Sequence, residues 1–142
     1  MTQHPIERRY RRLAVGANRK AERLKTPGRI TDRDLFAAYE ASDGCCEYCG
    51  IDVDPLENSF DHVIPFDKGG ENTPANIKIC CMTCQREKFT KTPDEYEQWK
   101  ELVRVCPVDG KRFRPRWADH VRGYGKYCSR KCSGAIGGAS RG

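Results

Sequence analysis

Two Cys-x-x-Cys pairs constrain the fold of this chain more than any other feature of its sequence. The pairs are Cys46/Cys49 and Cys81/Cys84, and 31 residues lie between them. Each pair can supply half of a tetrahedral thiolate shell, so the two together predict a structural four-cysteine Zn²⁺ site. A redox-active pair and four unbonded cysteines are the alternatives. Cys45 and Cys80 adjoin these pairs, and we favour the CxxC register over a CxxxC register in both.

A structural zinc site is consistent with the composition of the chain. Only 37% of its 142 residues are hydrophobic, 32% are charged, and the mean hydropathy is −0.80. Such a chain buries little apolar surface, so we expect zinc binding to supply folding free energy on the order of 10 kcal/mol. The nine cysteines, an odd number, favour metal ligands over a disulfide framework. The sequence shows neither a signal peptide nor a membrane span, which predicts a cytoplasmic protein without a membrane partner.

Charge lies along the chain in three blocks. The net charge is +7 over residues 1–30, −8 over residues 31–100 and +7 over residues 101–142. Two basic flanks predict contacts with a polyanion, although they can also serve solubility alone. We interpret residues 1–30 as a basic arm that orders on its partner, with a helix over 6–24 as the alternative. The arginines expected to bind DNA are Arg8, Arg9, Arg11, Arg12, Arg114 and Arg116.

Two helices and a tail can be predicted from local signals. Thr31 and Asp34 have the spacing of a capping box, and Ser42-Asp43-Gly44 ends that helix. Thr92 and Pro93 begin a second helix, which the apolar spacing extends to about Val105. The glycine-rich tail over residues 134–142 is expected to be disordered.

A second group of cysteines lies in the C-terminal basic block. Cys106, Cys128 and Cys132 resemble part of a small zinc ribbon, in which Asp109 stands where a further cysteine is expected. A carboxylate can ligate zinc, and His120 is another candidate for the fourth ligand. We therefore predict a zinc-ribbon-like module over residues 106–133. A metal-free basic loop is the alternative.

The segment between the CxxC pairs carries residues suited to phosphodiester hydrolysis. Asp61 and His62 place a carboxylate beside an imidazole, which is the side chain best able to take a proton near neutral pH. A carboxylate also binds Mg²⁺ or Mn²⁺. Neighbouring residues on a regular strand point to opposite faces, so both can serve one site only from a strand end or a twisted loop.

The order of the motifs narrows this interpretation. CxxCG, DHVIPFDKGG, NxxxNIKI and CxxCQxxK follow one another between residues 46 and 88. Over about residues 31–92 the chain resembles the HNH endonucleases, specifically the zinc-stapled members found in phages. The resemblance implies a small α+β domain with a ββα-metal fold, which we place at residues 31–105 between the basic arm and the ribbon-like module.

The resemblance also implies roles for single residues. His62 would be the general base, Asp61 the first ligand of the catalytic metal, and Gln85 the second. Asn76 would hold the loop of the hairpin, and Lys88 matches a basic position that can contact phosphate. The family usually has histidine or asparagine where this chain has Gln85. A site of oxygen donors alone favours Mg²⁺ or Mn²⁺ over Ni²⁺ or Zn²⁺.

The function implied is that of a metal-dependent DNA endonuclease. A site with one catalytic metal cuts one strand at a time, so nicking is expected, with 5′-phosphate and 3′-hydroxyl products. One alternative is a catalytically degenerate, zinc-stapled DNA-binding accessory protein, for example one that partners a phage packaging or recombination machine. Another is a nuclease that acts on RNA. The resemblance suggests a phage-encoded protein that acts in the bacterial cytoplasm.

Overall fold

The protein has an α+β architecture, and the computed structural model describes residues 4–137. The described part of the chain divides into two compact units, one up to Pro93 and one from Asp94 onward. The first unit differs from the predicted organisation, which separated a basic arm at residues 1–30 from a domain at residues 31–105. The difference arises because the N-terminal segment packs into the first unit.

Helix α1, Pro5–Arg23, forms in the segment expected to be a flexible arm, so that expectation was wrong. The helix buries Tyr10, Ala14 and Asn18, which recur every four residues along one face. The ring of Tyr10 is fully buried, with its centroid 4.8 Å from that of Phe36 and 5.0 Å from that of Phe60. These buried side chains hold α1 against the rest of the first unit, although most of its other side chains are charged.

Helix α2, Asp32–Ala41, begins and ends where the sequence predicted. Thr31 and Asp34 form the capping box, and Ser42 is the C-terminal cap. The helix buries Leu35 against the core that also contains Tyr10 and Ile77. It packs on strand β2, Ile77–Cys80, and on α1.

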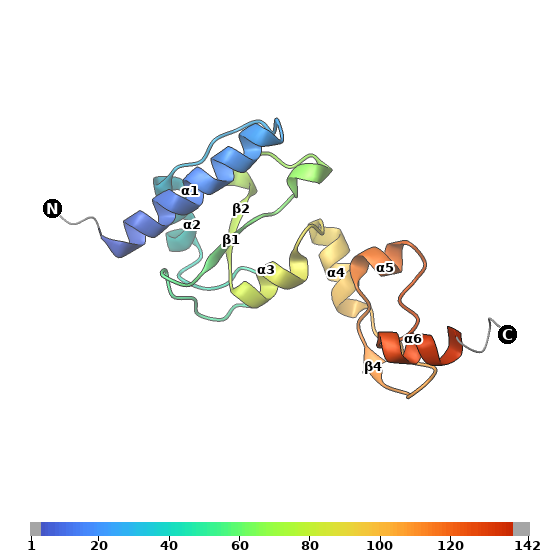
Figure 1. Cartoon of the computed structure of the whole chain (residues 1–142). Coiled ribbons are helices and arrows are strands. Elements are labelled where there is room, and N and C mark those ends of the chain that lie inside the picture. The colour runs from blue at the N-terminus through green and yellow to red at the C-terminus, as the bar shows by residue number, and fades with distance from the viewer. Residues whose placement is uncertain (1–3, 138–142) are drawn as a thin grey trace. The chain divides into compact units, whose positions relative to one another are not determined.

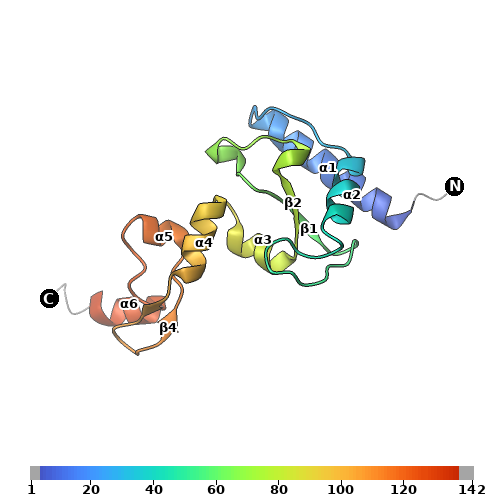
Figure 2. The same cartoon turned by 180° about the vertical axis from the view of Figure 1, so that it is seen from behind.

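A two-stranded antiparallel hairpin forms the centre of the first unit. Strand β1, Ser59–His62, pairs with β2, Ile77–Cys80, so that His62 lies opposite Ile77. The connection contains two short 3₁₀ helices, η1 at Phe66–Lys68 and η2 at Pro74–Asn76. Helix α3, Met82–Lys88, follows β2 and contacts β1. Figures 1 and 2 show the hairpin between the pair α1 and α2 and helix α3.

Gly70 permits the connection between the strands to fold tightly on itself. A Cβ atom at this position would lie 1.7 Å from the carbonyl oxygen of Ile64 and 2.9 Å from that of Pro65. The backbone amide of Gly70 donates to the same Pro65 oxygen at 2.9 Å. No side chain fits this close approach, so glycine is required here.

The second unit is built from short elements. Helix α4, Pro93–Glu101, is shorter than predicted because the chain turns into strand β3, Arg104–Val105, which pairs with β4, Arg112–Phe113. Helix α5, Trp117–Val121, comes next. Helix α6, Arg130–Gly137, includes the start of the tail expected to be disordered. The Ser129 hydroxyl supports its first turn by accepting from the Cys132 amide at 3.2 Å. Residues 138–142 lie outside the described part of the chain.

None of the helices within residues 4–137 combines the length and the hydropathy needed to cross a membrane.

Candidate active site

The four cysteines of the two CxxC pairs converge on one point. The Sγ atoms of Cys46, Cys49, Cys81 and Cys84 all lie within 4.8 Å of one another, and Cys49 Sγ is 3.8 Å from Cys81 Sγ. A zinc ion bound tetrahedrally at about 2.3 Å from each sulfur requires an S–S separation of roughly 3.8 Å. The donor set and its spacing therefore fit zinc, and the four cysteines that lie together are those of the predicted CxxC register.

The backbone near Cys46 favours its thiolate, whereas burial raises the pKa of Cys84. The amides of Tyr48 and Cys84 point at Cys46 Sγ and Cys81 Sγ, each at 3.4 Å. Burial raises the pKa of Cys46, but hydrogen bonds from the backbone of Cys81, Cys49 and Tyr48 outweigh burial and lower the pKa to about 7. A thiolate is the form of cysteine that binds metal.

Cys45 and Cys80 lie outside the cluster and have other partners. The Cys45 thiol donates to Asp52 Oδ1 at 3.3 Å, and the Cys80 thiol donates to Gln85 Oε1 at 3.1 Å. Burial raises the pKa of Cys80, so this thiol stays protonated at neutral pH.

The second unit contains a cluster of its own. Ligand atoms of Cys106, Asp109, Cys128 and Cys132 lie within 4.8 Å of one another. The Lys111 amide, which donates to Asp109 Oδ1 at 3.0 Å, is the largest of the influences that lower the pKa of Asp109 to about 2. Three sulfurs and one ionised carboxylate are a donor set that zinc accepts. His120 is not part of this group, and Arg104 donates to its Nδ1 at 2.7 Å.

Asp61, His62 and Gln85 line one cavity of about 270 Å³. His62 is the last residue of β1, and this position at a strand end lets two neighbouring residues reach the same space. Gln85 comes from α3, whereas Lys20 and Leu24 of the α1 segment close another wall. The cavity is thus lined both by three residues predicted from the motifs and by residues of the α1 segment, which lies outside the motifs.

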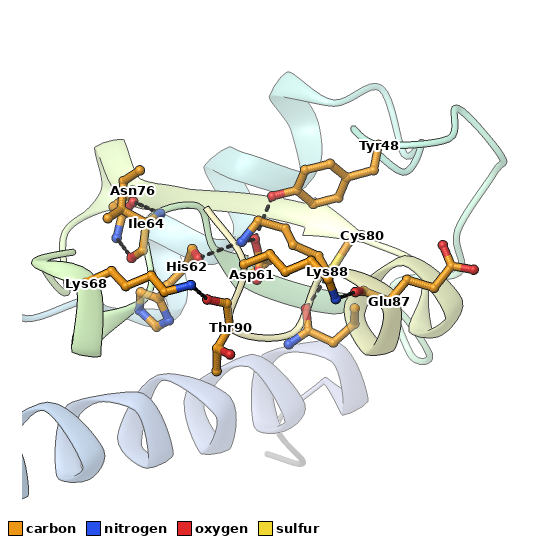
Figure 3. Close-up of polar contacts among 12 residues, drawn as sticks. Tyr48, Asp61, His62, Ile64, Lys68, Asn76, Cys80, Glu87, Lys88 and Thr90 are labelled. Atoms are coloured by element: carbon orange, nitrogen blue, oxygen red, sulfur yellow. Dashed lines mark hydrogen bonds and ion pairs between the residues drawn. The ribbon is translucent and has the colours of Figure 1, made fainter. Parts of the chain in front are cut away.

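Two groups hold the same oxygen of Asp61. Tyr48 Oη donates to Asp61 Oδ2 at 2.5 Å, and Lys88 Nζ lies 2.8 Å from that atom (Figure 3). Asp61 is only 3% exposed. Because both groups bind Oδ2, Oδ1 is the candidate atom of Asp61 for binding a cation.

Lys88 does not occupy the place expected of a phosphate contact. Its side chain is fully buried, and its ammonium group binds Asp61 Oδ2 and donates to the carbonyl oxygen of His62 at 3.3 Å. A buried ammonium group needs such partners, because leaving it unpaired is costly. The expectation of a phosphate contact was therefore wrong for this structure, and Lys88 instead supports Asp61.

His62 is half-buried and makes one polar side-chain contact. Its Nε2 lies 2.9 Å from Asn72 Oδ1, and its ring packs on Phe66 with centroids 4.3 Å apart. Burial lowers the pKa of His62 below 6.5, and the hydrogen bond to Asn72 offsets part of this shift. The imidazole is therefore neutral at pH 7. Sequence reasoning missed Asn72, although it is the first asparagine of the NxxxN motif.

Asn76 ties the connection between the strands together. Its Oδ1 accepts from the Ile64 amide at 2.8 Å and its Nδ2 donates to the Ile64 carbonyl oxygen (Figure 3). The same Nδ2 also donates to the Glu71 carbonyl oxygen at 2.8 Å. These three bonds fix the backbone directly after His62, which is the place that the predicted role requires.

The arginines predicted to bind DNA fall into two groups. Arg9 donates to the carbonyl oxygens of Pro55 and Asn58, and Arg114 donates to that of Lys100 at 2.8 Å while lying over the Trp99 ring. These two guanidinium groups are tied to their own units. Arg114 is nevertheless exposed, and so are the other four, of which Arg11 also lies 3.9 Å from Asp32. They are Arg8, Arg11, Arg12 and Arg116.

Comparison with known proteins agrees with the motifs. Residues 46–106 match the family model described as HNH endonuclease, so the resemblance to this family is confirmed for that segment. No curated protein matches the chain significantly. Among solved structures, the Type II-C Cas9 enzyme from Actinomyces naeslundii aligns with a TM-score of 0.43 and 26% identity over 64% of this chain. The chain spans about 10% of that enzyme's length.

Proposed function

We propose that this protein is a metal-dependent endonuclease that nicks DNA. The observation that carries the proposal is the single cavity lined by His62, Asp61 and Gln85 within the segment that matches the HNH family. A neutral imidazole, a carboxylate oxygen and an amide oxygen at one cavity are suited to hydrolysis of a phosphodiester. The proposal includes a ββα-metal arrangement of β1, β2 and α3.

His62 acts as the general base in this scheme. Its ring takes a proton from a water molecule, whose oxygen forms a bond to phosphorus as the bond from phosphorus to O3′ breaks. The released O3′ takes up a proton, which leaves 5′-phosphate and 3′-hydroxyl ends. Asp61 Oδ1 and Gln85 Oε1 are the atoms that would hold Mg²⁺ or Mn²⁺. When bound there, such an ion would supply positive charge to stabilise the leaving oxygen.

Exposed arginines of both units contribute affinity for DNA through its phosphates. Such binding is expected to weaken steeply as the salt concentration rises. Arg8, Arg12 and Arg116 are the clearest candidates because they are exposed. Each of the two cysteine clusters binds one structural Zn²⁺ in this proposal, and the second stabilises the ribbon-like module.

A second candidate function is that of a DNA-binding accessory protein without catalysis. Two observations favour it: Lys88 already neutralises Asp61, and the Gln85 carbonyl oxygen already accepts from Cys80. Both contacts compete with a catalytic cation for its ligands.

Nicking of a supercoiled plasmid tests the two functions against each other. Wild type, His62→Ala and the control His4→Ala, which removes an exposed imidazole, are compared with Mg²⁺ or Mn²⁺ at pH 8. We expect His62→Ala to lower the nicking rate by about 10²- to 10⁴-fold without loss of DNA binding. Binding without nicking by the wild type would favour the accessory function. Faster nicking with Ni²⁺ than with Mn²⁺ would contradict the oxygen-donor site.

A further inference from the structure

A chain of buried side-chain amides leads from helix α1 to the candidate general base. Asn18 Oδ1 accepts from Asn72 Nδ2 at 2.8 Å, and Asn72 Oδ1 lies 2.9 Å from His62 Nε2. Asn18 is 7% exposed and Asn72 is fully buried. Because both amides are buried, each is restricted to the partners that the fold supplies.

The backbone determines how these amides are oriented. Asn18 Nδ2 donates to the Ile30 carbonyl oxygen at 2.9 Å, and the Ile30 amide donates to Asn18 Oδ1 at 3.0 Å. If the Asn18 amide were reversed, its Nδ2 would face the donor of the Ile30 amide and its Oδ1 would face the Ile30 carbonyl oxygen, which is an acceptor. Its Oδ1 must therefore face Asn72. Asn72 then has to present Nδ2 to Asn18 and Oδ1 to His62.

This orientation selects one tautomer of the imidazole. Asn72 Oδ1 can only accept, so His62 Nε2 must carry the hydrogen. In a neutral ring the lone pair is then on Nδ1, which is the atom able to take a proton from water. The opposite tautomer would place two acceptors 2.9 Å apart.

The segment after α1 also contacts the backbone of Asn72. The Asn72 amide donates to the Pro27 carbonyl oxygen at 2.9 Å. Gly28, at φ +104°, approaches so closely that a Cβ there would lie 2.4 Å from the Asn72 carbonyl oxygen. Asn72 is therefore fixed by side-chain and backbone contacts to residues 18–30, which lie outside the segment that matches the HNH family.

We propose that Asn18 is a positioning residue that sets the tautomer of His62 through Asn72, which makes helix α1 part of the catalytic machinery. The inference rests on the proposed nuclease function for its catalytic consequence. The tautomer itself is a property of the folded chain.

Nuclear magnetic resonance of protein with ¹⁵N-labelled histidine tests the proposal directly. The nitrogen shifts of His62 are measured at pH 8, where the ring is neutral, and are assigned with His62→Ala. We expect the hydrogen on Nε2 in the wild type. In Asn18→Leu we expect a mixture of tautomers and a nicking rate at least about tenfold lower, with unchanged DNA affinity. Val15→Ala, at an exposed position of α1, serves as the matched control and should retain both properties.

A second variant keeps the test decisive if Asn18→Leu does not fold. Asn18→Asp keeps an acceptor for Asn72 and for the Ile30 amide, so it should retain the hydrogen on Nε2. A wild-type spectrum with the hydrogen on Nδ1, or an unchanged tautomer in a folded Asn18→Leu, would overturn the proposal. A wild type that shows the expected tautomer but does not nick DNA would refute the nuclease function alone.

Discussion

Lys88 Nζ lies 2.8 Å from Asp61 Oδ2, and the two side chains are 0% and 4% exposed. The pair joins the C-terminal end of α3 to β1, and Tyr48 from the first CxxC pair binds the same oxygen. Each of these buried charges stabilises the other, because an unpaired charge in the low-dielectric interior would be destabilising. Several properties of the protein should therefore respond to this contact.

Lys88→Met should destabilise the first unit by about 3–5 kcal/mol, because it leaves the Asp61 carboxylate buried without its counter-charge. Urea denaturation measures this loss. The double variant Lys88→Met/Asp61→Asn should recover much of the stability, since it removes both charges. A loss below about 1 kcal/mol in Lys88→Met would show that the ion pair does not form.

Metal content should reflect two independent cysteine clusters. Elemental analysis of the purified protein is expected to give two zinc ions per chain. Cys49→Ser and Cys132→Ser should each remove one of them, because each residue belongs to a different cluster. Cys45→Ser is the matched control and should retain both, since Cys45 donates to Asp52 instead. A zinc content that Cys132→Ser leaves unchanged would contradict the second site.

Tyr10 should make the protein less stable at alkaline pH. Burial is the main cause that raises the pKa of Tyr10 to about 12, from about 10 in an unfolded chain. Above pH 10 the unfolded state releases the phenol proton while the folded state keeps it, so stability declines between pH 10 and about 12.

Comparison with Tyr10→Phe isolates this effect. Phenylalanine loses the hydrogen bond to Asn58 but cannot ionise, so the variant should be less stable at pH 8 by about 1 kcal/mol. The difference in unfolding free energy should shrink from pH 10 to 12. A difference that stays constant across this range would exclude a role for Tyr10 ionisation.

Gly70→Ala should be more damaging than Gly69→Ala in thermal unfolding. The added methyl group at residue 70 would overlap the Ile64 carbonyl oxygen, so the backbone beside His62 must move. Gly69 has a positive φ of 88° but open space around it, and its substitution should cost only about 1–2 kcal/mol of backbone strain. Equal losses in the two variants would contradict the close approach at Gly70.

The sequence allowed prediction of those parts of the site that depend on short-range spacing. The CxxC register and the capping box of Thr31 and Asp34 follow from residues close together in the chain, whereas the place of Asn76 in the loop was implied by the resemblance to the HNH family. Their partners lie nearby or are set by metal geometry, so local patterns are sufficient.

The features that could not be predicted depend on contacts between distant residues. Helix α1 packs through Tyr10, Ala14 and Asn18, a stripe with only one large side chain in a mostly charged segment, and the core residues that it contacts lie far along the chain. A lysine is usually exposed, and nothing local indicates that Lys88 lies buried beside Asp61. Asn72 gains its contact with His62 because Asn18, 54 positions earlier, orients its amide.

The packing of α1 also bears on where a minimal fragment of this protein can begin. A fragment cut at residue 46, where the family match starts, would lose Tyr10, Ile30 and Leu35 from the core around Ile77. It would keep all four cysteines of the first cluster and would still take up zinc. Zinc content would then be a misleading measure of correct folding, because a fragment with its zinc bound would still lack the residues that cover its hydrophobic core.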